Sequence, residues 1–126
     1  FRYAIRPHQG FDSSEAKKFG IGQSQPLIPI PAQEGQQSLP SLFTLEGSPA
    51  IIVSSLKPAR DGNGWSVRLF NTSGQEATAE LNWGDNKAGA MYRSNPEEAI
   101  LEPLDTGIKM EGWEILTVRV TADGKR

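Results

Sequence analysis

The sequence of 126 residues contains no cysteine, a single histidine and no long apolar run. Without cysteine there is no disulfide scaffold, no thiolate zinc site and no cysteine nucleophile. No segment approaches the roughly 20 apolar residues of a membrane helix, so we expect no membrane partner. The net charge is −2, with both signs mixed along the chain, so no basic face for nucleic acid stands out. These absences leave a soluble chain long enough for one compact domain and an arm.

The first residues already alternate like a β-strand. Phe1, Tyr3 and Ile5 are separated by polar or small residues, which predicts a strand over residues 1–7 with one covered face. The sequence begins without methionine or a signal peptide. We therefore expect it to be a piece of a larger protein.

A short helix is predicted after this strand. Asp12 has the form of an N-cap, with Glu15 three residues later, and a helix over residues 16–19 follows. Gly20 is placed to end it. The proline-rich residues 25–32 must be extended, as a sheet edge or a polyproline-like arm, and the polar residues 33–38 are predicted to be a linker.

From about residue 42 the pattern changes to short strands separated by turn residues. The strongest turn signal is Asp61-Gly62-Asn63-Gly64. The strand expected near residues 50–56 is apolar on both faces, as in a central strand. A change of phase after Ile115 predicts a bulge or bend near Glu114. Strands are expected over residues 41–46, 50–56, 65–69, 77–83, 90–93, 99–102, 108–110 and 113–120.

Together these patterns predict an all-β fold. The architecture is an antiparallel β-sandwich, immunoglobulin-like or similar, with an N-terminal arm that contains one strand and a short helix. We place the arm and linker at residues 1–38 and the sandwich domain at residues 39–126. Its predicted core contains Val53, Val67, Leu69, Leu81, Trp83, Leu116 and Val118.

No group of residues is marked for catalysis. The fifteen acidic residues lie mostly at turns or on polar faces, as Asp61, Glu80 and Glu114 do, and are predicted to be solvated. His8 is the single histidine and is expected to pack or hydrogen-bond locally. We therefore assign no catalytic, cofactor-binding or metal-binding residue to this chain.

Two polar or aromatic features leave alternatives open. Asn71-Thr72-Ser73 fits the N-glycosylation sequence. Trp65 and Trp83 fall on apolar strand faces and are predicted to be in the core. Trp113 is out of phase with its strand, so it is the candidate for an exposed ring, and a core position is the equal alternative. Because exposed rings stack on sugars, a free-standing carbohydrate- or protein-binding β-sandwich module remains an alternative.

Several segments resemble one enzyme family. Phe1 to Gly10 is similar to the aromatic-x-Tyr-Ala-Leu-x-Pro-His segment near the end of the large β-supersandwich of glycoside hydrolase family 38 α-mannosidases. Val53 to Pro58 and Val67 to Gly74 resemble paired strands of the family's last small β-domain, and Glu114 to Val120 resembles its final strand. Asn71 stands where many relatives carry glutamate, and residues 86–106 match nothing that the family shows.

The resemblance implies a non-catalytic C-terminal β-domain of a retaining, zinc-dependent hydrolase of α-mannosides. In such enzymes the zinc ligands and the nucleophilic aspartate lie in an N-terminal α/β domain and a helical region outside this sequence. We therefore expect no cofactor in this chain, zinc in the parent enzyme, and the catalytic domain as the partner. Residues 1–32 are expected to fold back on the sandwich or to pair with a second copy of the chain.

Overall fold

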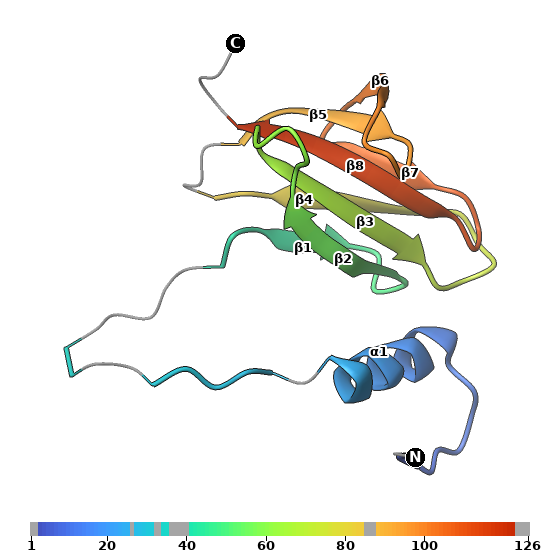
Figure 1. Cartoon of the computed structure of the whole chain (residues 1–126). Helices are drawn as coiled ribbons and strands as arrows, with labels where there is room; N and C mark the ends of the chain where they lie inside the picture. Colours follow the sequence, from blue (N-terminus) through green and yellow to red (C-terminus); the bar gives the residue numbers. More distant parts are fainter. Residues whose placement is uncertain (1–2, 26, 32–33, 36–40, 85–87, 123–126) are drawn as a thin grey trace.

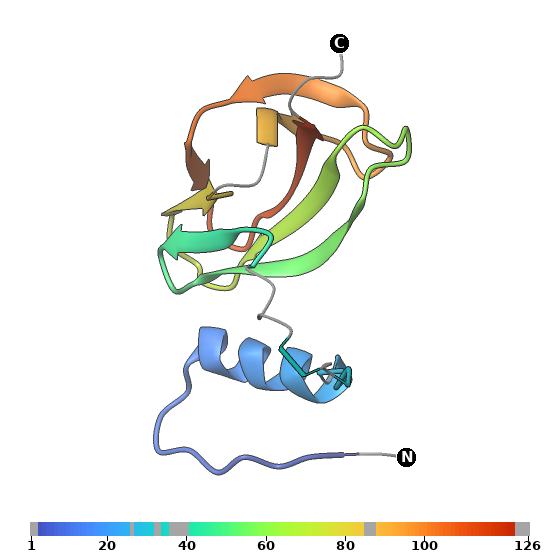
Figure 2. The same cartoon turned by 90° about the vertical axis from the view of Figure 1, so that its left-hand side faces the viewer.

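The computed structural model describes residues 3–25, 27–31, 34–35, 41–84 and 88–122. These residues form two β-sheets that enclose one core, with a single helix beside them (Figures 1 and 2). The helix is α1 (Ser13–Ser24), and the strands are β1 (Thr44–Gly47), β2 (Ile51–Pro58), β3 (Trp65–Asn71), β4 (Ala77–Asn82), β5 (Ala88–Ser94), β6 (Ile100–Leu104), β7 (Gly107–Met110) and β8 (Ile115–Ala122).

The strands pair in an antiparallel manner throughout the described residues. One sheet has three strands in the order β1-β4-β7, and the other has five in the order β2-β3-β8-β5-β6. The stretch 88–106, for which the sequence showed no family counterpart, supplies β5 and β6 at one edge of the larger sheet. The prediction of an all-β antiparallel sandwich is confirmed.

The core lies between the two sheets and is apolar. Six of the seven predicted core residues are buried, and the seventh, Val53, is partly buried and packs against the others. Phe43 adds a ring whose centroid lies 4.9 Å from that of Trp83. The buried cluster contains Ile51, Val67, Leu69, Ala79, Leu81, Trp83, Ile108, Met110, Leu116, Val118 and Val120.

The connection between β2 and β3 forms the predicted turn. The Ala59 N–H donates to the Gly64 carbonyl at 3.0 Å, and the Gly62 N–H donates to the Ala59 carbonyl at 2.9 Å. Gly64 has φ +97°, and a Cβ there would overlap the Val120 carbonyl oxygen. Glycine is therefore required at this position for both conformation and space.

Helix α1 begins where predicted but ends later. Asp12 is the N-cap, and its carboxylate accepts the Glu15 N–H at 2.9 Å. The prediction that Gly20 ends the helix is wrong, because the helix continues to Ser24. A glycine only lowers helix stability, whereas the residue before a proline, here Gln25, disfavours helical backbone. No helix within the described ranges is long and apolar enough to cross a membrane.

The strand expected over residues 1–7 is absent from its described part, residues 3–7. A strand needs a neighbour for its backbone hydrogen bonds, and these residues pair with no described strand. Tyr3 and Ile5 are therefore exposed, as are Leu27, Ile28 and Ile30. These five side chains do not fold back on the sandwich, and the other expected arrangement, pairing with a second copy of the chain, stays a prediction.

Strand β2 lies at the edge of its sheet, so the prediction of a central strand is wrong. Its first two residues, Ile51 and Ile52, are buried although they point to opposite faces, while its last four are exposed. Helix α1 contacts this strand and lies on the β1–β2 side of the sandwich (Figures 1 and 2). An edge strand that a helix covers can have apolar residues on both faces, as a central strand does, so the sequence pattern does not distinguish the two.

Candidate functional site

The β3–β4 loop and the β7–β8 loop meet around the buried side chain of Asn71. Its Nδ2 donates to the Gln75 carbonyl at 2.7 Å and to the Glu111 carbonyl at 2.9 Å. Its Oδ1 accepts the Ser73 N–H at 3.1 Å and the Ser73 hydroxyl at 2.9 Å. Asn71 is 0% exposed. Its amide nitrogen is therefore inaccessible, so the match of residues 71–73 to the glycosylation sequence does not mark a usable acceptor in this fold.

The β7–β8 loop is a tight turn that displays Trp113. The Glu114 N–H donates to the Glu111 carbonyl at 3.3 Å, and the Trp113 N–H donates to the Ser73 carbonyl at 2.8 Å. Trp113 has φ +63°, a left-handed conformation that is rare for a bulky residue. The predicted bend near Glu114 is confirmed. Trp113 is 58% exposed, which decides between the two alternatives that the sequence left open for this ring.

Two glycines allow these loops to touch. A Cβ on Gly112 would lie 2.5 Å from the Gly74 carbonyl carbon and oxygen. A Cβ on Gly74 would lie 3.0 Å from the indole Nε1 of Trp113. Glycine is therefore needed at position 112, whereas a Cβ at position 74 would require a shift of the indole by a few tenths of an ångström. The indole rests against the backbone of the β3–β4 loop.

Glu114 stabilises the same turn through both of its carboxylate oxygens. One carboxylate oxygen pairs with Arg93 Nη1 at 2.6 Å, and the other accepts the Glu111 N–H at 2.8 Å. The side chain is only 21% exposed. The prediction that Glu114 is a solvated surface acid is wrong, because β5 supplies a cation that the local sequence does not show.

A buried arginine lies on β8 near the β2–β3 turn. Arg119 is 3% exposed and pairs through Nη2 with Asp61 Oδ1 at 2.6 Å. The Asn63 N–H first, and the hydrogen bond from Arg119 second, hold the pKa of the Asp61 carboxyl below its ordinary value. The Asp61 side chain is 64% exposed, which confirms the prediction of a solvated acid, and it also pairs with a buried cation that the local sequence does not show.

Glu98 ties the β5–β6 turn to the β2–β3 turn. Its carboxylate accepts the Arg60 N–H at 2.7 Å and pairs with Lys57 Nζ at 2.7 Å. The Arg60 N–H, followed by the Lys57 hydrogen bond, lowers the pKa of the Glu98 carboxyl. Asp61 and Glu98 are thus held ionised against cations, an arrangement that stabilises loops.

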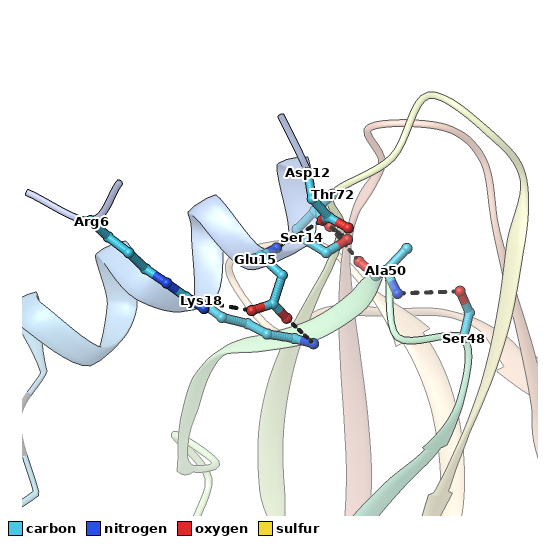
Figure 3. Close-up of polar contacts among 8 residues, drawn as sticks. All are labelled: Arg6, Asp12, Ser14, Glu15, Lys18, Ser48, Ala50 and Thr72. Atoms are coloured by element: carbon cyan, nitrogen blue, oxygen red, sulfur yellow. Dashed lines mark hydrogen bonds and ion pairs between the residues drawn. The ribbon is translucent and has the colours of Figure 1, made fainter. Parts of the chain in front are cut away.

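Helix α1 is joined to the sandwich by a chain of hydroxyl hydrogen bonds. The Thr72 hydroxyl donates to the Ala50 carbonyl at 2.8 Å and lies 2.7 Å from the Ser14 hydroxyl, so Ser14 is the donor to Thr72 (Figure 3). The Ala50 N–H in turn donates to the Ser48 hydroxyl at 3.3 Å. The start of the helix is therefore fixed to the connections around β2.

Exposed charges surround the N-terminal turn of α1. Glu15 pairs with Arg6 and with Lys18, each at 3.5 Å (Figure 3). The segment before the helix and α1 line a hollow of about 450 Å³ that includes His8, Phe11 and Phe19. His8 Nδ1 lies 2.8 Å from the Gly10 carbonyl, which confirms the predicted local hydrogen bond.

A zinc site requires several histidine, cysteine, aspartate or glutamate side chains close together. Within the described ranges, no three histidine, cysteine, aspartate or glutamate side chains come together in a way that would hold a metal ion. His8 is in any case bonded to its own loop. The described residues of this chain therefore do not fit a zinc site.

The sequence patterns did not identify three buried or partly buried polar residues that hold loops together. Two of the three have a local signal in the sequence. Arg119 interrupts a run of apolar residues in β8, and Asn71 ends a strand just before a Ser-Gly turn. Glu98 has no such signal, because Arg60, which it contacts, is 38 residues away.

Comparison with known proteins gives one result that covers most of the sandwich. Residues 50–118 match the family model described as the glycosyl hydrolases family 38 C-terminal beta sandwich domain. The matched range contains β2 to β7 and the loops around Asn71. It also includes residues 86–106, so the expectation that this stretch has no counterpart in the family is wrong. No curated protein matches the sequence.

Proposed function

Since this chain belongs to the glycosyl hydrolase family 38 C-terminal β-sandwich domains, we propose that it is the non-catalytic end domain of a retaining, zinc-dependent α-mannosidase. Its role is to pack against the catalytic part and to shape that part. Residues 1–38 are the arm and linker that come from the preceding β-supersandwich, and residues 39–126 are the end domain. The zinc ligands and the nucleophile belong to the catalytic part and not to this chain.

One observation carries the packing role, namely the exposed apolar arm. Tyr3 is 88% exposed and Leu27 is 98% exposed, and Ile5, Ile28 and Ile30 are exposed to a similar degree. Fully burying one such side chain stabilises a structure by roughly 1.5–3 kcal/mol. These two exposed apolar strips therefore favour a partner surface, and the absence of a strand partner for Tyr3 and Ile5 among the described residues favours a sheet edge as that surface.

The first test concerns this arm within the complete enzyme. We expect the double variant Tyr3→Ser, Ile5→Ser to destabilise docking of the end domain by about 3–6 kcal/mol, seen as a separate, earlier thermal transition. The control is Leu101→Ser, an exposed apolar residue on β6 outside the arm. Equal melting of the arm variant and the control would show that the arm has no docking role.

The second test concerns activity. The chain alone should hydrolyse no aryl α-mannoside and bind no stoichiometric zinc, whereas the complete enzyme should do both. The readouts are p-nitrophenol release and zinc content by mass spectrometry. Hydrolysis that survives repurification and scales with the concentration of the chain would contradict the proposal.

A free-standing carbohydrate- or protein-binding module is the alternative. Such a module commonly presents several rings on one face, but Trp83 is buried and Trp65 packs against the core. A reading frame that contains no catalytic part ahead of Phe1 would favour this alternative. A catalytic domain there would favour the α-mannosidase.

A further inference from the structure

The turn that carries Trp113 holds an exposed ring in a fixed position. The backbone is bonded to Ser73, and the indole rests on Gly74 while more than half of the residue stays exposed. Glu114 and Asn71 each bond to the Glu111 backbone at the start of the same turn. The ring therefore has little freedom to lose when it binds a ligand, which favours affinity.

This display is unfavourable for the domain by itself. A left-handed backbone is strained for a bulky residue, and such strain persists only where the surroundings impose it. Because the indole is exposed, the domain also loses most of the stabilisation that a buried tryptophan would contribute. Strained, exposed positions of this kind gather at functional sites, which makes a ligand the natural reason for the turn.

Polar side chains accompany the ring in the same pair of loops. Gln75 follows the glycine against which the indole rests, and its side chain is exposed. Glu111 precedes the turn and is exposed, and Glu76 pairs with Lys109 at 2.8 Å where the two loops enter β4 and β7. The two loops and strands that hold the ring thus also carry an amide, carboxylates and an ammonium group.

We propose that the Trp113 turn is a non-catalytic carbohydrate-binding surface. The indole stacks on the C–H face of a pyranose ring, whose weakly positive hydrogens complement the negative aromatic face. Gln75 and Glu111 hydrogen-bond the hydroxyl groups at the edge of the sugar. The choice of an α-mannoside as ligand rests on the proposed function, in which the parent enzyme acts on such sugars.

A protein partner fits this surface less well. Specific protein interfaces bury about 800 Å² on each partner and are depleted of lysine, glutamate and aspartate at their centre. One tryptophan supplies only about 150–250 Å², and its loop neighbours include Glu76, Lys109 and Glu111. A small, polar, hydroxyl-rich ligand matches both the size and the charge.

The test is a titration of the whole 126-residue chain with methyl α-mannopyranoside and with α-linked mannotriose. The readout is the indole N–H signal of each tryptophan in a ¹⁵N correlation spectrum. We expect a saturable shift of the Trp113 signal at millimolar sugar. Trp113→Ala should weaken binding at least about fivefold, and Trp113→Phe should retain part of the affinity.

Ile115→Ala is the matched control, because Ile115 is also exposed, lies two residues away and is apolar. It should leave sugar affinity unchanged. If Trp113→Ala does not fold, Gln75→Ala replaces it, and this variant should also weaken binding. A lack of saturable shift in the wild-type chain, or equal loss in the Ile115 variant, would overturn the carbohydrate site.

The outcome is separable from the proposed function. In the complete enzyme, Trp113→Ala should leave hydrolysis of p-nitrophenyl α-mannoside unchanged, because the surface is not catalytic. Loss of that activity or of docking in this variant, without any sugar-dependent shift in the wild type, would assign the turn to contact with the catalytic part instead. That result would overturn the carbohydrate site and leave the α-mannosidase proposal standing.

Discussion

Replacing Asn71 with alanine should destabilise the domain by about 2–4 kcal/mol. The substitution removes both Nδ2 hydrogen bonds, at 2.7 Å and 2.9 Å, and both hydrogen bonds that Oδ1 accepts from Ser73. The Glu111 carbonyl loses the Asn71 donor, whereas the Gln75 carbonyl keeps the Ser73 hydroxyl at 3.1 Å. An unsatisfied buried polar group costs roughly 1–3 kcal/mol. Because Gln75 and Glu111 are exposed, water compensates in part, which places the expected loss below the sum of two full penalties.

The assay is urea unfolding at pH 7 followed by tryptophan fluorescence. A stability loss of this kind lowers the midpoint of unfolding and leaves the slope unchanged. Asn71→Asp should be at least as damaging as Asn71→Ala, because a carboxylate oxygen would then face two carbonyl oxygens. In the Asn71→Asp variant, hydrogen exchange of the Trp113 backbone amide should also accelerate, since the two loops lose the hydrogen bonds that Asn71 makes to both of them.

Asn82→Ala is the matched control, an asparagine at the exposed end of β4 whose amide reaches Glu46 at 3.3 Å. It should change the free energy of unfolding by less than about 0.5 kcal/mol. The reasoning is refuted if Asn71→Ala falls within the same range. The two loops would then be held by their backbone contacts and glycines alone.

Three further perturbations test the core, the β2–β3 turn and the charge cluster. Leu81→Ala should cost about 2–5 kcal/mol in urea unfolding and Glu80→Ala less than about 0.5, and equal effects would mean that the phase of β4 is wrong. Gly64→Ala should destabilise strongly, whereas Gly62→Ala, which has open space and only an unfavourable φ of +72°, should cost about 1 kcal/mol; equal costs would contradict the clash. The pKa of Asp61 lies below its ordinary value of 3.8, so its contribution is complete above pH 3.8 and is lost as the pH falls through the folded pKa. Asp61→Asn should therefore lose less stability than the wild type between about pH 4 and pH 2 in thermal unfolding, and parallel curves would refute the linkage.

Local patterns predicted most strands because their signals are local. Period-2 alternation over residues 77–82 identifies β4 and its inward residues Leu81 and Ala79, and the Asp-Gly-Asn-Gly run identifies the turn after β2. The change of phase before Leu116 likewise predicted the bend that exposes Trp113. Each of these signals depends on neighbours within a few residues.

The mistaken predictions share a cause. Gly20 looked like a helix end, although a glycine weakens a helix without stopping it. The apolar start of β2 looked like a central strand because a strand covered by a helix and a strand covered by a sheet both carry apolar residues on the covered face. The strand at residues 1–7 had the right alternation, but a strand also requires a neighbour that no local pattern supplies.

The sequence by itself determined the class of fold, the positions of most strands and turns, and which tryptophan is out of phase with its strand. Only the tertiary structure decided which acids are engaged, since the partners of Asp61, Glu98 and Glu114 come from distant strands and loops. It also decided that Asn71 is an anchor between two loops and not a glycosylation site. The physical reason is that alternation and turn chemistry act between neighbours in the chain, whereas burial and charge pairing act between neighbours in space.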